Sequence, residues 1–456
     1  MTFSIVSRRT ASAMVLATFA ALALAAEPVG PAIPLQAAAA DFHAHHVLCE
    51  RDGGKLWGTS LCGPMMFVDP ATRQAVLNDS APGAVKEGSL YRVTLPATVG
   101  LANTAVEYAG KRWSMLLWPL PRDKTDRDIM LMHESYHRIQ PALRLEPTGG
   151  VAANAHLDTE AGRIWLRAEF HALRTALEAH GHVRRQAIVD ALRFRVYRRS
   201  LFPHAAAEED ALELNEGLAE STGIDAALAT PRARIAAAIE DIDHHEKDPS
   251  YVRSFAYATG PAYAELLDAA EPGWRRSVTR DFDFGKAVAR AYHIAVPEAN
   301  AKLAHAALQR YGGNAILKQE AERAKRVAIR NRRYTAEFLD GPTLTFPLSG
   351  PLQDLRITFD PRAVESFAGH GSVYHVLTIG SAWGTLSVTS GDALINSAFS
   401  AVTVPITGPL HGSTLAGRGW SAQLKPGFEL ARNGRKKNSL EVIAPGGTPA
   451  HASSSP

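Results

Sequence analysis

Cysteine is scarce in this chain, which has only Cys49 and Cys62 among its 456 residues. Their spacing, with 12 residues between them, is much longer than the C-x-x-C spacing of zinc clusters, so a metal role is disfavoured. Gly53 and Gly54 lie between two short apolar runs and predict a hairpin that a disulfide closes. Such a loop would contribute about 3 kcal/mol by the chain-entropy model. Two unpaired buried thiols are the alternative.

An excess of either charge is also missing. The chain has 49 Lys and Arg residues and 46 Asp and Glu residues, so its formal net charge is +3. This balance predicts no basic surface, so nucleic acid is not an expected partner. With 46% apolar residues, the chain can form more than one core and should comprise two to three units.

Long hydrophobic runs are absent except near the N-terminus, where Ala13 to Ala25 are almost all apolar. This run follows Arg8 and Arg9, ends in a small-x-small triplet, and is shorter than the roughly 20 residues that span a bilayer. We therefore expect a signal peptide over residues 1–25, export to a periplasmic or secreted location, and no membrane span after cleavage. An uncleaved N-terminal anchor is the alternative.

Apolar spacing and turn residues predict an α+β fold. The expected regions are a linker (26–40), an N-terminal β region (41–120), a helical catalytic domain (121–335), a C-terminal β-sandwich (336–445) and a disordered tail (446–456).

The segment LMHESYHRIQ contains His133, Glu134 and His137 in the pattern H-E-x-x-H. A helix capped by Thr125 and ended by Pro141 would place both imidazoles on one face, where they could bind one zinc ion. Glu134 could then hold a water molecule without being a ligand. Because the chain has 18 histidines, a chance match is the alternative reading.

A third protein ligand is expected on the helix ALELNEGLAESTG (211–223), with Gly223 as its C-terminal stop. Glu213, Glu216 and Glu220 share one stripe of this helix, which would ordinarily be a solvated acidic face. The rest of the helix is small and apolar, however, and Gly217 would permit close approach of another helix.

The two motifs together resemble the gluzincin metallopeptidases, a family that includes thermolysin and the alanyl aminopeptidases. The resemblance implies that Glu216 is the third zinc ligand and that Glu220 orients a zinc-binding histidine. It also implies a hydrolase that uses one zinc ion, with Glu134 as the general base. This chain departs from the family in the 78 residues between His137 and Glu216, which predict an inserted helical hairpin at 158–202 that could form a wall of the substrate cleft.

Other features refine the expected activity. The chain has no G-x-M-E-N sequence, the element by which the aminopeptidases of this family hold a free amino terminus. An endopeptidase is therefore favoured over an aminopeptidase. The segment YVRSFAYATG resembles the Y-x-x-G element of the family, which implies that Tyr257, with Gly260, supplies a transition-state donor. An ordinary semi-buried tyrosine is the alternative. By analogy, residues 111–118 would form the edge strand that binds substrate.

We therefore expect an exported zinc metallopeptidase that acts on a peptide or protein. The alternatives are a non-catalytic binding or structural protein on the same scaffold, and a zinc hydrolase of non-peptide amides. The clusters HAHH (43–46) and IDHHEK (242–247) are expected to be incidental.

Overall fold

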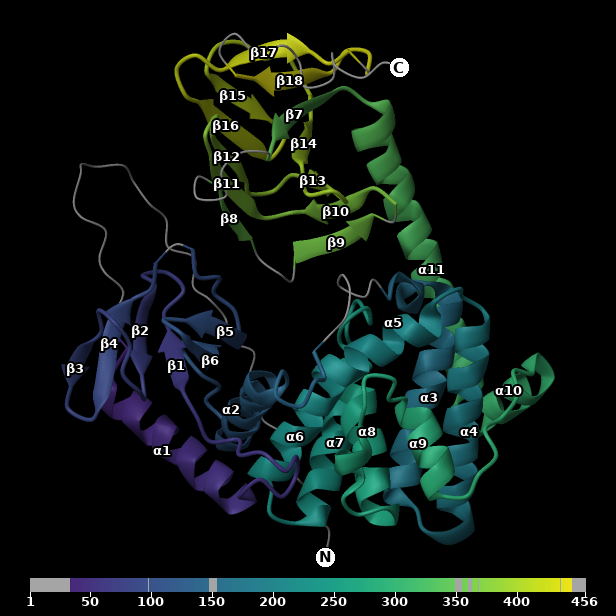
Figure 1. Ribbon diagram of the computed structural model, residues 1–456. Helices are drawn as coiled ribbons and strands as arrows, with labels where there is room; N and C mark the ends of the chain where they lie inside the picture. Colours follow the sequence, from purple (N-terminus) through teal and green to yellow (C-terminus); the bar gives the residue numbers. More distant parts are fainter. Residues whose placement is uncertain are drawn as a thin grey trace, which may run out of the picture.

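The computed structural model describes residues 33–444, except 97, 147–153, 349–354, 360–362, 368 and 435. A β region, a helical region and a second β region follow one another along the chain (Figure 1), which confirms the α+β class. The expected signal peptide, the expected tail and the first part of the expected linker lie outside the described residues. Among the helices within those ranges, none is long and apolar enough to cross a membrane.

The N-terminal region is a mixed sheet with the strand order β3-β4-β2-β1-β6-β5. Its strands are β1 (Met65–Val68), β2 (Gln74–Leu77), β3 (Val85–Glu87), β4 (Leu90–Thr94), β5 (Thr104–Tyr108) and β6 (Lys111–Leu117). Strand β6 pairs in parallel with β1 and antiparallel with β5, so it lies inside the sheet. The expectation that residues 111–118 form the edge strand is therefore wrong, because β5 occupies that edge.

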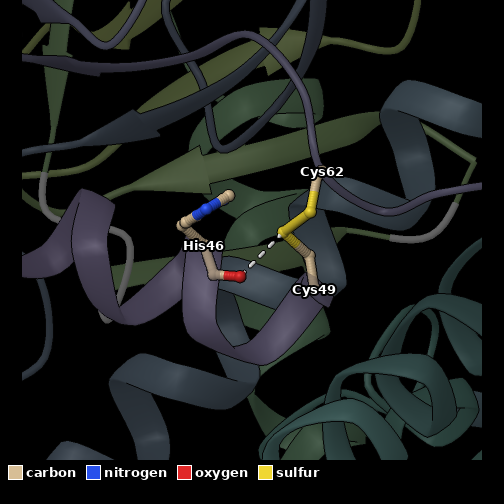
Figure 2. A group of neighbouring side chains, drawn as sticks. All are labelled: His46, Cys49 and Cys62. Carbon is tan, nitrogen blue, oxygen red and sulfur yellow. Dashed lines mark hydrogen bonds between the residues drawn. A yellow bond between two sulfur atoms is a disulfide. The ribbon is translucent and has the colours of Figure 1, made fainter. Parts of the chain in front are cut away.

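A helix, α1 (Leu35–Asp52), precedes the sheet, where a linker and β structure were expected. Its alanine-rich start favours helix, and its apolar side chains pack on the sheet, with the Phe42 and Phe67 rings stacked 4.2 Å apart. Cys49 lies in the last turn of α1 and forms the expected disulfide with Cys62 (Figure 2). The disulfide therefore ties a helix end to the following loop, and the expected hairpin is wrong.

The disulfide also decides the chemistry of the HAHH cluster. His46 lies beside it, and the Cys49 sulfur is 3.3 Å from the His46 carbonyl oxygen (Figure 2). The sulfur atoms of Cys49 and Cys62 are bonded to each other, so neither is a thiolate. These two residues and His46 therefore offer no thiolate ligand to a metal ion.

The central region is helical. Its α-helices are α2 (Lys124–Ile139), α3 (Glu160–Glu178), α4 (Gly181–Ser200), α5 (Ala205–Leu212), α6 (Leu218–Ala227), α7 (Pro231–His245), α8 (Phe255–Ala270), α9 (Phe284–Ala291), α10 (Ala301–Leu308) and α11 (Gly313–Tyr334). Short turns of other helical types are η1 (Ala155–Asp158), η2 (Glu213–Gly217), η3 (Trp274–Ser277), η4 (Gln309–Tyr311) and η5 (Thr335–Asp340). The expected helical hairpin at 158–202 is present as α3 and α4.

The C-terminal region is a sandwich of two sheets, with the strand orders β17-β18-β7-β14-β13-β10-β9 and β15-β16-β12-β11-β8. Helix α11 leads into it from the helical region (Figure 1). Phe346 from the first sheet and Trp383 beside the second belong to the same buried hydrophobic cluster. The strands are β7 (Thr343–Pro347), β8 (Arg356–Phe359), β9 (Val364–Phe367), β10 (Gly371–Tyr374), β11 (Leu377–Ser381), β12 (Gly384–Val388), β13 (Ala393–Asn396), β14 (Ala401–Pro405), β15 (Thr414–Gly417), β16 (Trp420–Leu424), β17 (Glu429–Arg432) and β18 (Leu440–Ile443).

Two glycines set the contact between η2 and α8. A Cβ atom built on Gly260 would lie 2.3 Å from the Cα atom of Gly217. This distance is far shorter than a van der Waals contact between two carbon atoms. Gly217 therefore permits the close approach of another helix, as expected. That helix is α8, which approaches at Gly260. The clashing atoms belong to the backbone, so a side chain at Gly260 would have to move a helix.

We predict that Gly260→Ala lowers the free energy of unfolding by about 2 kcal/mol, because overpacking outweighs the roughly 1 kcal/mol gain in helix propensity. Urea denaturation would measure the loss. Gly100→Ala is the control, since a Cβ atom there meets nothing within 4 Å. Equal stability of the two variants would show that η2 and α8 can separate freely.

A buried histidine makes stability depend on pH. His45 of α1 is 3% exposed, and its Nε2 atom lies 2.9 Å from the Ser135 hydroxyl of α2. That hydroxyl also donates to the Leu131 carbonyl at 2.8 Å. Burial, aided by the Arg138 cation, lowers the pKa of His45 from 6.5 to about 4.

The unfolded chain therefore binds a proton at His45 below pH 6.5, whereas the native protein does so only near pH 4. Stability should be complete above pH 6.5 and fall by about 3 kcal/mol as the pH drops to 4. We expect His45→Gln to lose that part of the pH dependence, measured by urea denaturation of metal-free protein. Parallel stability profiles for the two proteins would contradict this assignment.

Candidate metal centre

Helix α2 carries the H-E-x-x-H motif. Its N-cap is Asp123, whose carboxylate accepts hydrogen bonds from the amides of Thr125 and Asp126, so the expected cap at Thr125 is wrong by two residues. The helix ends at Ile139, before Pro141, as expected. Its back face is fixed in the core by Tyr136, whose hydroxyl donates to the Leu214 carbonyl at 3.2 Å.

The third residue of the group comes from η2, a π-helical turn between α5 and α6. Such turns insert an extra residue into a helix and occur often at functional sites. Glu213 and Glu216 are 1% and 6% exposed, so the solvated acidic face is excluded for both. Glu213 accepts hydrogen bonds from Arg195 and Thr259, whereas Glu216 faces α2.

Gly223 has a role different from the expected helix stop, because α6 continues to Ala227. A Cβ atom on Gly223 would lie 2.7 Å from the Ile129 carbonyl oxygen and 3.4 Å from the Cβ atom of His133. Gly223 therefore allows α6 to cross α2 at the level of the motif.

This crossing brings His133, His137 and Glu216 together. The two Nε2 atoms are 3.2 Å apart, and they lie 3.6 and 3.7 Å from the Glu216 Oε2 atom. Ligand atoms about 2.0–2.2 Å from one tetrahedral ion would lie about 3.3–3.5 Å from each other. The three side chains thus form a group that could hold one metal ion.

Both imidazoles are held through their other nitrogen atom. The His133 Nδ1 atom lies 2.7 Å from the Glu220 Oε2 atom, and the His137 Nδ1 atom lies 3.2 Å from the Gln140 Oε1 atom. A carboxylate or amide oxygen at Nδ1 accepts a hydrogen bond from the Nδ1–H group, which leaves Nε2 free as a ligand. Glu220 therefore lies where the sequence placed it, and Gln140 is a partner that sequence reasoning missed.

Glu134 lies beside this group. It is 4% exposed, and its Oε2 atom has no hydrogen-bond partner among the residues that the structure describes. Burial raises the pKa of its carboxyl group, and the His133 and His137 imidazoles partly offset that rise. An unsatisfied, nearly buried carboxylate oxygen is costly, and such groups are found where a ligand or water completes the site.

Both carboxylate oxygens of Glu216 accept hydrogen bonds. The Tyr257 hydroxyl donates to its Oε2 atom at 2.6 Å, and Arg253 and Asn215 donate to its Oε1 atom at 3.1 and 3.0 Å. The Tyr257 ring also stacks on the His133 imidazole, with the centroids 5.8 Å apart. Tyr257 of α8 is thus brought to the group, and Gly260 acts through packing.

The group opens into a cleft of about 780 Å³. One side is formed by Asn103 and Thr104, where the edge strand β5 begins, and another by α7. Among the described residues, those of the α3–α4 hairpin contribute nothing to its lining, so the expected cleft wall at 158–202 is wrong. The α7 residues in the cleft are Ala237, Glu240, Asp241, His244 and His245.

His245 is a second feature that sequence reasoning missed, because IDHHEK was expected to be incidental. Its Nδ1 atom lies 2.8 Å from the Asp248 Oδ2 atom, and its ring lies 5.7 Å from that of Tyr257. A carboxylate at Nδ1 fixes the orientation of an imidazole and leaves its other nitrogen available. Nothing in the local sequence shows that α7 faces the cleft.

No protein-family model, curated protein or solved structure matches this chain.

We predict that Glu220→Gln weakens the affinity of this group for a divalent metal ion about 10–100-fold, because the His133 imidazole loses the carboxylate that orients it. Competition with a chromophoric chelator would measure the affinity. Glu146→Gln is the control, since Glu146 lines the same cleft but pairs with Arg280 at 3.5 Å. An equal loss in both variants would indicate a general effect of charge.

Proposed function

We propose that this protein is an exported, zinc-dependent peptidase of the gluzincin type that cleaves within peptide chains. The observation that carries the proposal is the position of Glu134, a nearly buried carboxylate with an unpartnered oxygen, next to a two-histidine, one-glutamate group in an open cleft. A structural metal site needs no such base, whereas a hydrolase does.

The donor set suits zinc, which accepts imidazole nitrogen and carboxylate oxygen at a site with an open position for water. His133, His137 and Glu216 would hold the ion. When bound there, zinc acidifies water and polarises a carbonyl group. The disulfide between Cys49 and Cys62 supports export, because such bonds persist in oxidising compartments.

Side chains of the protein would carry out the proton transfer and the hydrogen bonding in the reaction. Glu134 takes a proton from the attacking water and delivers it to the leaving nitrogen as the C–N bond breaks. Tyr257 and His245 line the same cleft, where the Tyr257 hydroxyl can turn from Glu216 to donate to the oxygen that becomes negative. Glu220 keeps the His133 ring in place during the reaction.

The N-terminal sheet offers an edge to which the backbone of a substrate could bind. Within the described part of the chain, strand β5 pairs only with β6, and residues at its start line the cleft. An extended peptide can add to such an edge through main-chain hydrogen bonds. A peptide bound in this way would run across the cleft, which supports the proposal of cleavage within a chain.

We predict that the wild-type protein binds about one zinc ion and hydrolyses an unstructured protein. Glu134→Gln should keep the zinc and lose activity about 10²–10⁴-fold, because proton transfer is removed while the ligands remain. Glu216→Gln should lose both zinc and activity. Metal analysis and proteolysis of casein would test this.

Glu271→Gln, outside the cleft, is the control and should behave as wild type. The proposal fails if the wild-type protein binds no zinc, or if Glu134→Gln remains fully active.

A further inference from the structure

A second cavity lies in the C-terminal sandwich, at the point where α11 enters it (Figure 1). Its volume is about 670 Å³, which is within the range of small-molecule sites. The π-helical turn η5, the end of β14, and the turns that follow β10, β12 and β15 line it. None of the described residues that line this cavity belongs to the metal centre or its cleft. The proposed peptidase reaction therefore leaves it without a role.

Two turns of the sandwich are packed tightly against each other at this cavity. The amide groups of Thr389 and Ser390 both donate to the Gly419 carbonyl oxygen, at 3.0 and 3.3 Å. A Cβ atom on Gly419 would lie 2.3 Å from the Gly391 amide nitrogen, and one on Gly391 would lie 2.6 Å from the Arg418 carbonyl oxygen. The two glycines therefore fix the backbone of one turn against the other, and the cavity is formed before a ligand binds.

The charged side chains around the cavity compensate one another. Among the described residues that line it are two carboxylates, two guanidinium groups and one imidazole. Asp392 lies 3.1 Å from Arg333 and also forms a hydrogen bond with the Nδ1 atom of His375. Burial raises the pKa of the Glu337 carboxyl group, and the Arg333 and Arg418 guanidinium groups oppose that rise. Because charges of both signs lie side by side, the cavity suits an uncharged molecule.

Hydrogen-bonding groups are available to such a molecule. Thr389 and Ser390 are exposed, and a hydroxyl group can both donate and accept. The Oε2 atom of Glu337 is buried without a hydrogen-bond partner among the described residues, which is typical of a site that a ligand or water completes. Arg418 is exposed and adds several donors. A ligand with adjacent hydroxyl groups matches this mixture of donors and acceptors.

Apolar side chains form the rest of the lining. Val376 is 44% exposed, and Pro405 and Ile406 are half-buried beside the same cavity. A ligand with C–H groups can cover this apolar surface. A sugar ring carries both C–H groups and adjacent hydroxyl groups. Free amino acids and phosphate esters are charged, whereas the charged groups around this cavity already face one another.

We propose that the C-terminal sandwich binds a neutral sugar in this cavity, as a di- or trisaccharide segment, through hydrogen bonds to Glu337, Ser390 and Arg418. The sugar could belong to a polysaccharide or to a glycan on a protein, because both present the same ring chemistry. This binding does not depend on the proposed peptidase activity, since no described residue lines both the cavity and the cleft.

The test is saturation-transfer NMR on the full-length protein, with neutral trisaccharides of glucose, mannose, galactose and N-acetylglucosamine as probes. We expect at least one trisaccharide to bind, and calorimetry then measures the affinity of the strongest. Because an uncharged ligand is not screened, its affinity should change less than about twofold between about 0.1 and 0.5 M salt.

We expect Glu337→Ala and Arg418→Ala each to weaken this binding at least about tenfold, because each variant loses a hydrogen bond that involves a charged group. Arg418 is exposed, so its variant keeps the test valid even if Glu337→Ala fails to fold.

Glu429→Ala and Arg432→Ala are the matched controls. Both side chains are exposed on β17 of the same sandwich, and neither lines the cavity. We expect both variants to bind the trisaccharide as the wild-type protein does. An equal loss in these controls, or no loss in Glu337→Ala and Arg418→Ala, would show that the sugar does not bind in this cavity.

The inference is also overturned if none of the neutral trisaccharides binds, or if only charged counterparts such as tri-galacturonic acid or tri-glucosamine bind. A glycoprotein that carries the strongest-binding sugar, compared before and after enzymatic removal of its glycan, distinguishes the two sources. Loss of binding on removal supports a protein-linked glycan, and binding of the free trisaccharide alone supports a polysaccharide. Equal binding before and after removal would assign the cavity to a peptide and overturn the sugar site.

Discussion

The crossing of α2 and α6 is the contact on which the candidate metal centre depends. At Gly223 the backbone of α6 approaches the Ile129 carbonyl so closely that no side chain fits between them. Because of this approach, Glu220 reaches the Nδ1 atom of His133, and Glu216 lies opposite both Nε2 atoms. A separation larger by even one methyl group would leave the three ligand atoms too far apart for a single ion.

Buried ion pairs hold the turn that presents Glu216. Arg195 is buried between Glu213 and Glu169, and Arg198 lies between Glu169 and Glu209. Charges removed from water are tolerated only when partners replace the solvent, so removal of one member leaves the others uncompensated. The α3–α4 hairpin supplies both arginines. It therefore supports the ligand turn from behind and does not form part of the cleft.

The sequence predicted those parts of the site that depend on local spacing. The H-E-x-x-H spacing put His133 and His137 on one helix face, whereas Glu216 and Glu220 came from the resemblance to the gluzincins. Gly223 was misread because a glycine can end a helix or admit a neighbouring one, and only the tertiary packing decides which.

Features that depend on packing could not be predicted. The His245–Asp248 pair belongs to a segment whose sequence shows no sign that it faces the cleft. Helix α1 was missed because an alanine-rich start was read as a linker, although the same residues favour helix when a sheet is available to cover them. The edge position of β5 depends on the order of strands, which no short segment contains.

The distance along the chain between the two ligand helices has a consequence for how the protein folds. His133 and Glu220 are 87 residues apart, and the α3–α4 hairpin lies between them. Contacts between residues so distant in sequence form after local ones, because a long loop must be closed first. We therefore expect the centre to be assembled late, on a hairpin that has already folded. Until then, a nascent chain would carry an isolated pair of histidines with weak affinity for metal, without the carboxylate that η2 supplies.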